Sequence, residues 1–134
     1  MIHRRIHIKN WVVDFFIDNG GFVDFYEIVQ CLYEIGAEKD AVERALALFE
    51  RDLPNEAFTC STSMRRTCIY IGRTTSGKEF VNSIVHELRH LVDHIANYYG
   101  LDNGEAVGYI SGETAFLLAD DICRLGCEHC TNYN

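Results

Sequence analysis

The stretch from Ser76 to Tyr99 constrains the fold of this chain more than any other segment. Its sequence, SGKEFVNSIVHELRHLVDHIANYY, carries apolar residues at intervals of three and four. This spacing is typical of an amphipathic helix that buries one face in a protein core. The apolar positions are Phe80, Ile84, Val85, Leu88, Leu91, Val92 and Ile95. A long helix with such a face needs a second layer of structure to cover it.

The rest of the chain supplies strands and helices for that layer. The β-branched and aromatic residues from Trp11 to Ile17 predict a strand, and AFTCSTS and RTCIYIGRT predict an antiparallel pair. FVDFYEIVQCLYEIG and AEKDAVERALALFERDL have helical spacing, and a last helix is expected from about Glu105 to Leu125. The order β-α-α-β-β-α-α predicts one α+β domain over residues 1–134, with a small, mostly antiparallel sheet packed against helices.

The charge balance limits the partners that this chain can bind. The formal net charge is −8, which argues against nonspecific binding of nucleic acid, because such binding needs Lys and Arg to neutralise phosphates. The one basic cluster, HRRIHIK, has too few cations for a phosphate-binding surface and is interpreted as a charged edge strand. We therefore expect no nucleic-acid partner.

The sequence also predicts a soluble, cytoplasmic protein that does not bind a membrane. No apolar run approaches the roughly 18 residues needed to cross a bilayer, and no signal-peptide pattern follows the first basic residues. In the cytoplasm the six cysteines are expected to be mostly reduced. A disulfide framework is therefore not the preferred interpretation.

The predicted helix at 76–99 contains His86-Glu87-Leu88-Arg89-His90, an H-E-x-x-H pattern. Residues four apart on a helix lie about 40° apart around the axis and about 6 Å along it, so both imidazoles can share one zinc ion. Glu87 lies beside that position, where it can take a proton from a zinc-activated water. The alternative is that His86 and His90 are ordinary histidines paired with carboxylates such as Glu87 and Asp93.

A catalytic zinc site needs a third protein ligand, and the segment DNGEAVGYISGETA offers Glu105 and Glu113. HELRH followed after a turn by GEAVGY resembles the gluzincin metalloproteases of the thermolysin type. This resemblance implies a small zincin-like domain with Zn2+ bound by His86, His90 and Glu105, and Glu87 as general base. In a straight antiparallel helix pair, however, Glu113 would lie level with His90, so both glutamates remain candidates.

Several neighbouring residues are assigned less directly. Thermolysin-like enzymes carry an aspartate four residues after the third ligand, and this chain has Tyr109 there. His94 continues the four-residue spacing, but ligands on three consecutive turns would span about 12 Å, so it is expected to be a hydrogen-bonded neighbour rather than a ligand. The resemblance also implies a donor to the developing oxyanion. The candidates are Tyr98, Tyr99, Tyr109 and His94.

The C-terminal segment CRLGCEHC places Cys123, Cys127 and Cys130 at intervals of four and three. Buried reduced thiols are the preferred interpretation. The alternative is that Cys127 and Cys130 form half of a structural zinc site, which Cys123, His129, Cys60 or Cys68 would complete.

Together these features predict a zinc metallopeptidase that hydrolyses peptide bonds in a peptide or protein substrate. By analogy, Ile69 to Arg73 would pair with an extended substrate, or would simply be an internal strand. The wider pattern is also similar to short uncharacterised proteins of phages and gut-bacterial mobile elements. The alternative function is a non-proteolytic zinc-binding regulatory or partner-binding domain, and an oligomer that completes the site remains open.

Overall fold

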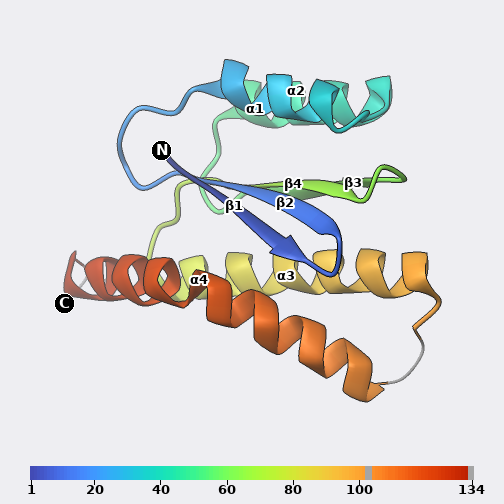
Figure 1. The fold of residues 1–134 in the computed structure, drawn as a ribbon. Helices are drawn as coiled ribbons and strands as arrows, with labels where there is room; N and C mark the ends of the chain where they lie inside the picture. Colours follow the sequence, from blue (N-terminus) through green and yellow to red (C-terminus); the bar gives the residue numbers. More distant parts are fainter. Residues whose placement is uncertain (102–103, 133–134) are drawn as a thin grey trace.

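The computed structural model describes residues 1–101 and 104–132, with side chains as far as residue 126. Its elements are β1 (Ile2–Ile8), β2 (Trp11–Ile17), α1 (Phe25–Glu34), α2 (Lys39–Arg51), β3 (Ala57–Thr62), β4 (Arg66–Ile71), α3 (Gly77–Tyr99) and α4 (Gly104–Asn132). The strands form one sheet in the order β1-β2-β4-β3. Helices α1 and α2 cover one face, and α3 and α4 cover the other (Figure 1). The predicted α+β class is confirmed.

The sheet is mixed, so the prediction of a mostly antiparallel sheet is only partly right. The outer pairs, β1 with β2 and β3 with β4, are antiparallel. The central pair, β2 with β4, is parallel, with α1, α2 and β3 between them in the chain. Both central strands are covered by helices on their two faces, which explains why their sequences are nearly continuous apolar runs.

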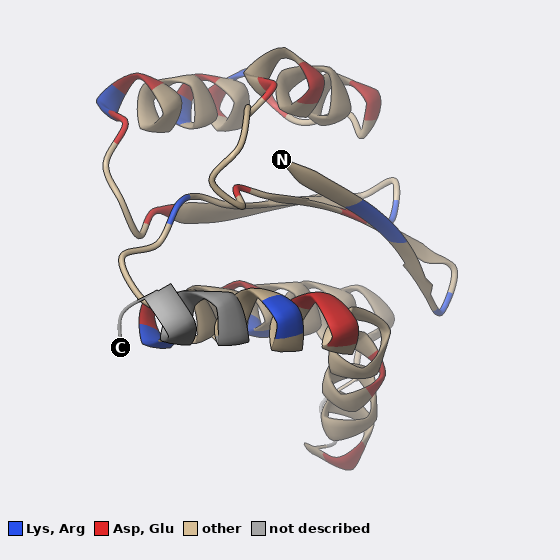
Figure 2. Ribbon diagram, turned by 90° about the vertical axis from the view of Figure 1, so that its left-hand side faces the viewer, with Lys and Arg blue, Asp and Glu red and all other residues tan. Residues whose placement is uncertain are grey.

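The charged N-terminal strand forms one edge of the sheet, as its sequence predicts. In β1, Ile2, Ile6 and Ile8 are buried, whereas Arg4 and Arg5 are exposed. The basic part of this strand is the blue segment at the sheet edge in Figure 2. Charges along an edge strand hinder pairing with a second chain.

The core has two parts, one on each side of the sheet. Trp11, Phe15 and Ile69 pack against α3 and α4, and Phe16, Cys68 and Tyr70 pack against α1 and α2. The opposite directions follow from the alternation of side chains along a strand. The sheet therefore separates the side chains of the α1/α2 layer from those of the α3/α4 layer.

Helix α3 is close to the segment predicted for it. The Ser76 side chain caps its first turn by accepting from the Glu79 N–H at 3.1 Å. Its end is set by Gly100, whose φ of 67° is left-handed and suits glycine. Helix α4 continues to Asn132, beyond the predicted end near Leu125. None of the described helices combines the length and apolar character that a membrane-spanning segment requires.

Candidate metal centre

His86 and His90 turn their side chains toward each other on the exposed side of α3. Their Nε2 atoms are 3.1 Å apart, and their ring planes are at 77°. One nitrogen donates and the other accepts, so the hydrogen bond uses the same Nε2 atoms that would bind a metal. At a tetrahedral zinc ion with Zn–N distances of about 2.0–2.1 Å, two ligand nitrogens lie about 3.3 Å apart. The spacing of this pair is therefore close to that of two zinc ligands.

Glu87 lies on the adjacent, buried side of the helix. Its side chain is 6% exposed, and Oε1 is 4.0 Å from His86 Nε2. Its Oε2 accepts a hydrogen bond from the hydroxyl of Thr59 on β3. A buried carboxylate is costly without partners, and among the described residues the polar side-chain partners of Glu87 are the Thr59 hydroxyl and the exposed His86 imidazole. A buried carboxylate beside the two candidate ligands lies where a general base would be needed.

Of the alternative pairings of the histidines with carboxylates, the structure contains that of His86 with Glu87, at 4.0 Å. Asp93 accepts from the Arg89 side chain at 3.1 Å, four residues away on the same helix. Glu87 interacts mainly with Thr59, and its separation from His86 is at the limit of an ion pair. The closest partner of each ligand candidate is the other histidine.

His94 lies one turn beyond His90, where it is half-buried. Its Nδ1 is 2.7 Å from the hydroxyl oxygen of Ser61 on β3, and its ring centroid is 6.3 Å from that of His90. Burial lowers the pKa of His94, and His90 lowers it further, against an opposing effect of Asp93. The expectation that His94 is hydrogen-bonded is confirmed.

Among the described residues, neither Glu105 nor Glu113, the two candidates for a third ligand, joins the histidine pair. Glu105 lies in the first turn of α4, which starts near the end of α3 and runs back beside it (Figure 1). Helix α4 contacts α3 and β1, whereas the side chains of Glu87 and His94 contact β3 at the opposite sheet edge. Helix α4 therefore lies along the other side of α3. Among the described residues, no three His, Cys, Asp or Glu side chains gather closely enough for a metal ion.

A hollow beside His86 contains a carboxylate that the sequence pattern did not indicate. This hollow of about 280 Å³ lies between α2, the start of β3 and α3, and is lined by Glu56 as well as His86 and Glu87. Glu56 is paired with Arg51 at 3.1 Å. Its position follows from the packing of β3 on α3, which no local pattern reveals.

The strand beside the candidate site is β3, whereas the analogy assigned this role to Ile69 to Arg73. That segment includes the end of β4, which pairs with β2 on one side and β3 on the other. Its backbone is therefore already paired, as in the alternative of an internal strand. Beside β3 and α2 lies a groove of about 810 Å³, which His94 also lines. The alternation of AFTCST directs Thr59 and Ser61 toward α3.

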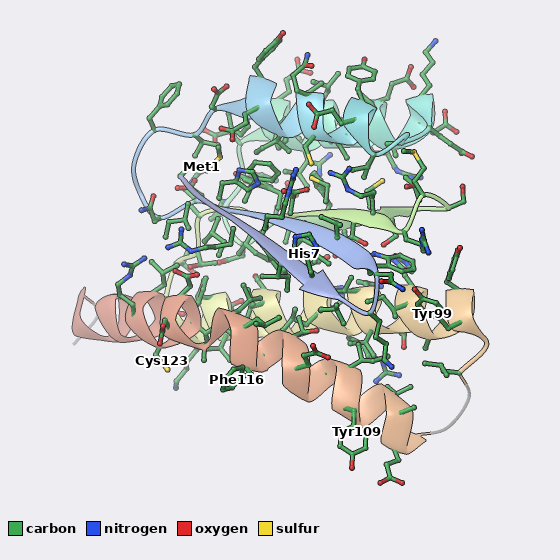
Figure 3. The ribbon with its side chains drawn as sticks, in the orientation of Figure 1. Met1, His7, Tyr99, Tyr109, Phe116 and Cys123 are labelled. Carbon is green, nitrogen blue, oxygen red and sulfur yellow. The ribbon has the colours of Figure 1, made fainter. Side chains whose placement is uncertain are left out.

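The tyrosines considered as oxyanion donors lie away from Glu87. Tyr99 donates its hydroxyl to the Lys9 carbonyl at 2.7 Å, and Tyr98 packs edge-on against Trp11. Tyr109 is 71% exposed and, like Phe116, lies on the side of α4 away from the sheet (Figure 3). Packing therefore accounts for Tyr98 and Tyr99.

Among the residues whose side chains are described, Cys60, Cys68 and Cys123 do not lie together at one site. Cys60 and Cys68 face the α1/α2 layer, so the sheet separates them from α4. Cys123 is exposed, contrary to the expectation of a buried thiol. The side chains of Cys127, His129 and Cys130 lie outside the described residues.

Comparisons of the chain with models of protein families, with curated proteins and with solved structures give no match in any of the three. Function therefore has to be inferred from the site itself, because an α+β fold is compatible with many activities.

Proposed function

We propose that this protein is a zinc-dependent metallopeptidase in which His86 and His90 bind the metal and Glu87 is the general base. The observation that carries the proposal is the 3.1 Å separation of the two Nε2 atoms beside a buried glutamate. Each histidine would have to carry its ring proton on Nδ1 to leave Nε2 free for the metal. Zinc binding and the present hydrogen bond therefore exclude each other.

In the proposed reaction Glu87 would transfer the proton and Thr59 would orient Glu87. A bound zinc ion lowers the pKa of a coordinated water toward about 7 and polarises a carbonyl group. Glu87 would accept the proton of the attacking water and pass it to the departing amine. The hydroxyl of Thr59 holds Glu87 Oε2, and Oε1 is the oxygen nearer to His86. In this proposal Thr59 orients the carboxylate, while Oε1 accepts the proton and then donates it.

The third ligand is proposed to be Glu105, as the resemblance to gluzincins implies. This assignment requires the first turn of α4 to move toward the histidines, since α4 lies along the other side of α3. Glu113 and Glu56 are the competing carboxylates. Glu56 needs the smaller change, because it already lines a hollow with His86, although it must leave Arg51.

A polypeptide substrate is favoured by the surroundings of Glu87. The edge strand β3 carries no charged residue and no proline, whereas β1 at the opposite edge carries two arginines. Unprotected edges accept additional strands through main-chain hydrogen bonds. An extended peptide beside β3 would pass Thr59, whose hydroxyl contacts Glu87.

Zinc content is the first experiment. Elemental analysis of protein purified without chelator should give one zinc per chain, and much less in a His86→Ala, His90→Ala double variant. Glu105→Ala, Glu113→Ala and Glu56→Ala, analysed in parallel, identify the third ligand by which of them loses zinc. No zinc in the wild type, even after dialysis against zinc, would contradict the proposal.

Hydrolysis separates the proposed enzyme from a zinc-binding regulatory domain. An unstructured protein substrate should be cleaved by the zinc-loaded wild type and not by Glu87→Gln. Zinc content without cleavage would favour the regulatory domain instead.

A further inference from the structure

A chain of hydrogen bonds runs from the core to the edge of the sheet and ends at His94. Trp11 Nε1 is 2.8 Å from Thr67 Oγ1, Thr67 Oγ1 is 2.7 Å from Ser61 Oγ, and Ser61 Oγ is 2.7 Å from His94 Nδ1. Trp11 and Thr67 are buried. These hydrogen bonds connect β2, β4, β3 and α3 in that order.

The number of protons that each side chain can donate fixes the direction of this series of hydrogen bonds. The indole of Trp11 can only donate, so Thr67 Oγ1 is an acceptor there. The proton of Thr67 also needs an acceptor, because the residue is fully buried. Among the described residues, the structure offers it Ser61 Oγ. The Ser61 proton is then directed to His94 Nδ1.

An imidazole whose Nδ1 accepts a hydrogen bond carries its proton on Nε2 when neutral. Because the Ser61 proton is directed to Nδ1, His94 is neutral in this arrangement. The side chain lines the groove of about 810 Å³ beside β3 and also a second hollow of about 380 Å³ that includes Trp11 and Tyr98. His94 therefore borders both hollows, and Nε2 is the nitrogen that Ser61 leaves unused.

The separation between His94 and Glu87 shows which part of a ligand this donor can reach. Ser61, the partner of His94, is two residues along β3 from Thr59, the partner of Glu87. Two residues of a strand span about 7 Å, and the seven residues from Glu87 to His94 span about 10 Å of helix. A donor at that distance serves a neighbouring peptide unit, not the bond that Glu87 would act on.

We propose that His94, fixed as the neutral Nε2–H tautomer, anchors a peptide bound beside β3 by donating to one of its main-chain carbonyl oxygens. The inference rests on the proposed function for its ligand, an extended peptide. His94 is a positioning residue in this scheme, with no part in the proton transfer.

The tautomer is tested without metal or activity. Long-range ¹H–¹⁵N NMR correlations of the ¹⁵N-labelled wild type should show the His94 proton on Nε2 near neutral pH. Thr67→Val, which removes the donor to Ser61, should give a mixture of the two tautomers. A wild-type proton on Nδ1, or an equal mixture, would reverse or abolish the direction of the chain and overturn the proposal.

Anchoring is tested by binding, in a background that cannot turn over the peptide. Fluorescence anisotropy with a pool of labelled, end-capped random nonapeptides should give a Kd about 3- to 10-fold higher for Glu87→Gln/His94→Phe than for Glu87→Gln alone, the range for one hydrogen bond. Glu87→Gln/His94→Gln, which keeps an N–H donor, should recover part of the loss. Equal Kd values for all three, or no binding of the pool at all, would contradict the proposal.

The two proposals can fail separately. Peptide binding that depends on His94, in a protein that holds no zinc and cleaves nothing, would end the peptidase proposal and leave the anchor intact. If the protein does cleave peptides, a His94→Phe variant with lower kcat and unchanged KM would place His94 at the reacting bond and overturn the anchor alone.

Discussion

The hydroxyl of Thr59 on β3 donates a hydrogen bond to the carboxylate of Glu87 on α3. This contact joins the edge strand of the sheet to the helix that carries both histidines. It fixes the buried carboxylate, so that Oε1 lies 4.0 Å from His86 Nε2. The candidate general base is thus held by a residue 28 positions earlier in the chain.

Replacing Thr59 with Val should destabilise the fold. Valine has nearly the same shape but no hydroxyl, so the Glu87 carboxylate loses its donor while it stays buried. The expected loss in the free energy of unfolding is about 1–3 kcal/mol, measured by urea denaturation with Trp11 fluorescence. Thr59→Ser keeps the hydroxyl and should lose less. A Thr59→Val variant as stable as the wild type would show that the hydrogen bond to Glu87 does not stabilise the fold.

Glu87→Gln should separate metal binding from catalysis. The amide keeps the size of the side chain but cannot act as a base, so peptide hydrolysis should fall by about 10²- to 10⁴-fold while zinc content stays the same. Fluorogenic peptide assays and elemental analysis measure the two effects. Glu50→Gln, at an exposed position on α2, is the matched control and should keep full activity. Unchanged hydrolysis in Glu87→Gln would remove the general-base assignment.

Zinc should raise the thermal stability of the wild type and not that of a His86→Ala, His90→Ala variant. A ligand that binds only the folded state at about 100 times its Kd adds about 2.7 kcal/mol to the free energy of unfolding. Differential scanning fluorimetry with and without zinc measures the shift in Tm. His7→Ala removes an exposed histidine of β1 and should keep the full shift. A similar shift in all three proteins would indicate binding elsewhere.

Acid should weaken the contribution of Asp14 to the free energy of unfolding. Asp14 is a buried carboxylate in β2, and it is contacted at 2.8–3.3 Å by Arg5, His3 and Arg66. Burial by itself would raise the pKa of Asp14, but the hydrogen bonds from Arg5 and His3 outweigh it and lower the pKa below 3.8. Because the pKa is lower in the folded state than in the unfolded state, ionised Asp14 stabilises the fold at pH values above the pKa of the unfolded state. This stabilisation is lost as the pH falls through the pKa of the folded state.

Asp14→Asn should therefore lower the free energy of unfolding by about 1.5–3 kcal/mol at pH 7, the range for hydrogen bonds to charged groups. The difference from the wild type should stay constant down to about pH 5 and shrink as pH falls below 3.8. Urea denaturation of both proteins at pH 7, 5 and 3 tests this. A difference that does not depend on pH would assign the effect to packing, not charge.

Local sequence patterns were sufficient for most of the secondary structure. The apolar spacing of 76–99 predicted α3 almost to the residue, because a buried helix face repeats with the helical period. The charged HRRIHIK segment predicted an edge strand, and AFTCSTS with RTCIYIGRT predicted the β3–β4 pair. These features depend on residues close together in the chain.

Strand order was not predictable in the same way. The parallel pairing of β2 with β4 joins Val12 to Arg66 and Ile17 to Ile71 across two helices and a strand. The apolar run of β2 indicates a strand buried on both faces but does not say which neighbours it has. That choice depends on the packing of α1 and α2 against one face of the finished sheet.

The sequence by itself determined that His86 and His90 share one side of a helix with Glu87 adjacent, because the helical repeat fixes their relative directions. Only the tertiary structure decided what surrounds them: Thr59 and Ser61 on an unprotected edge strand, and α4 on the other side of α3. The physical reason is that partners of a side chain come from burial of distant apolar faces: Ala57 of β3 and Ile84 of α3, for example, belong to one core. No spacing along the chain encodes such a contact.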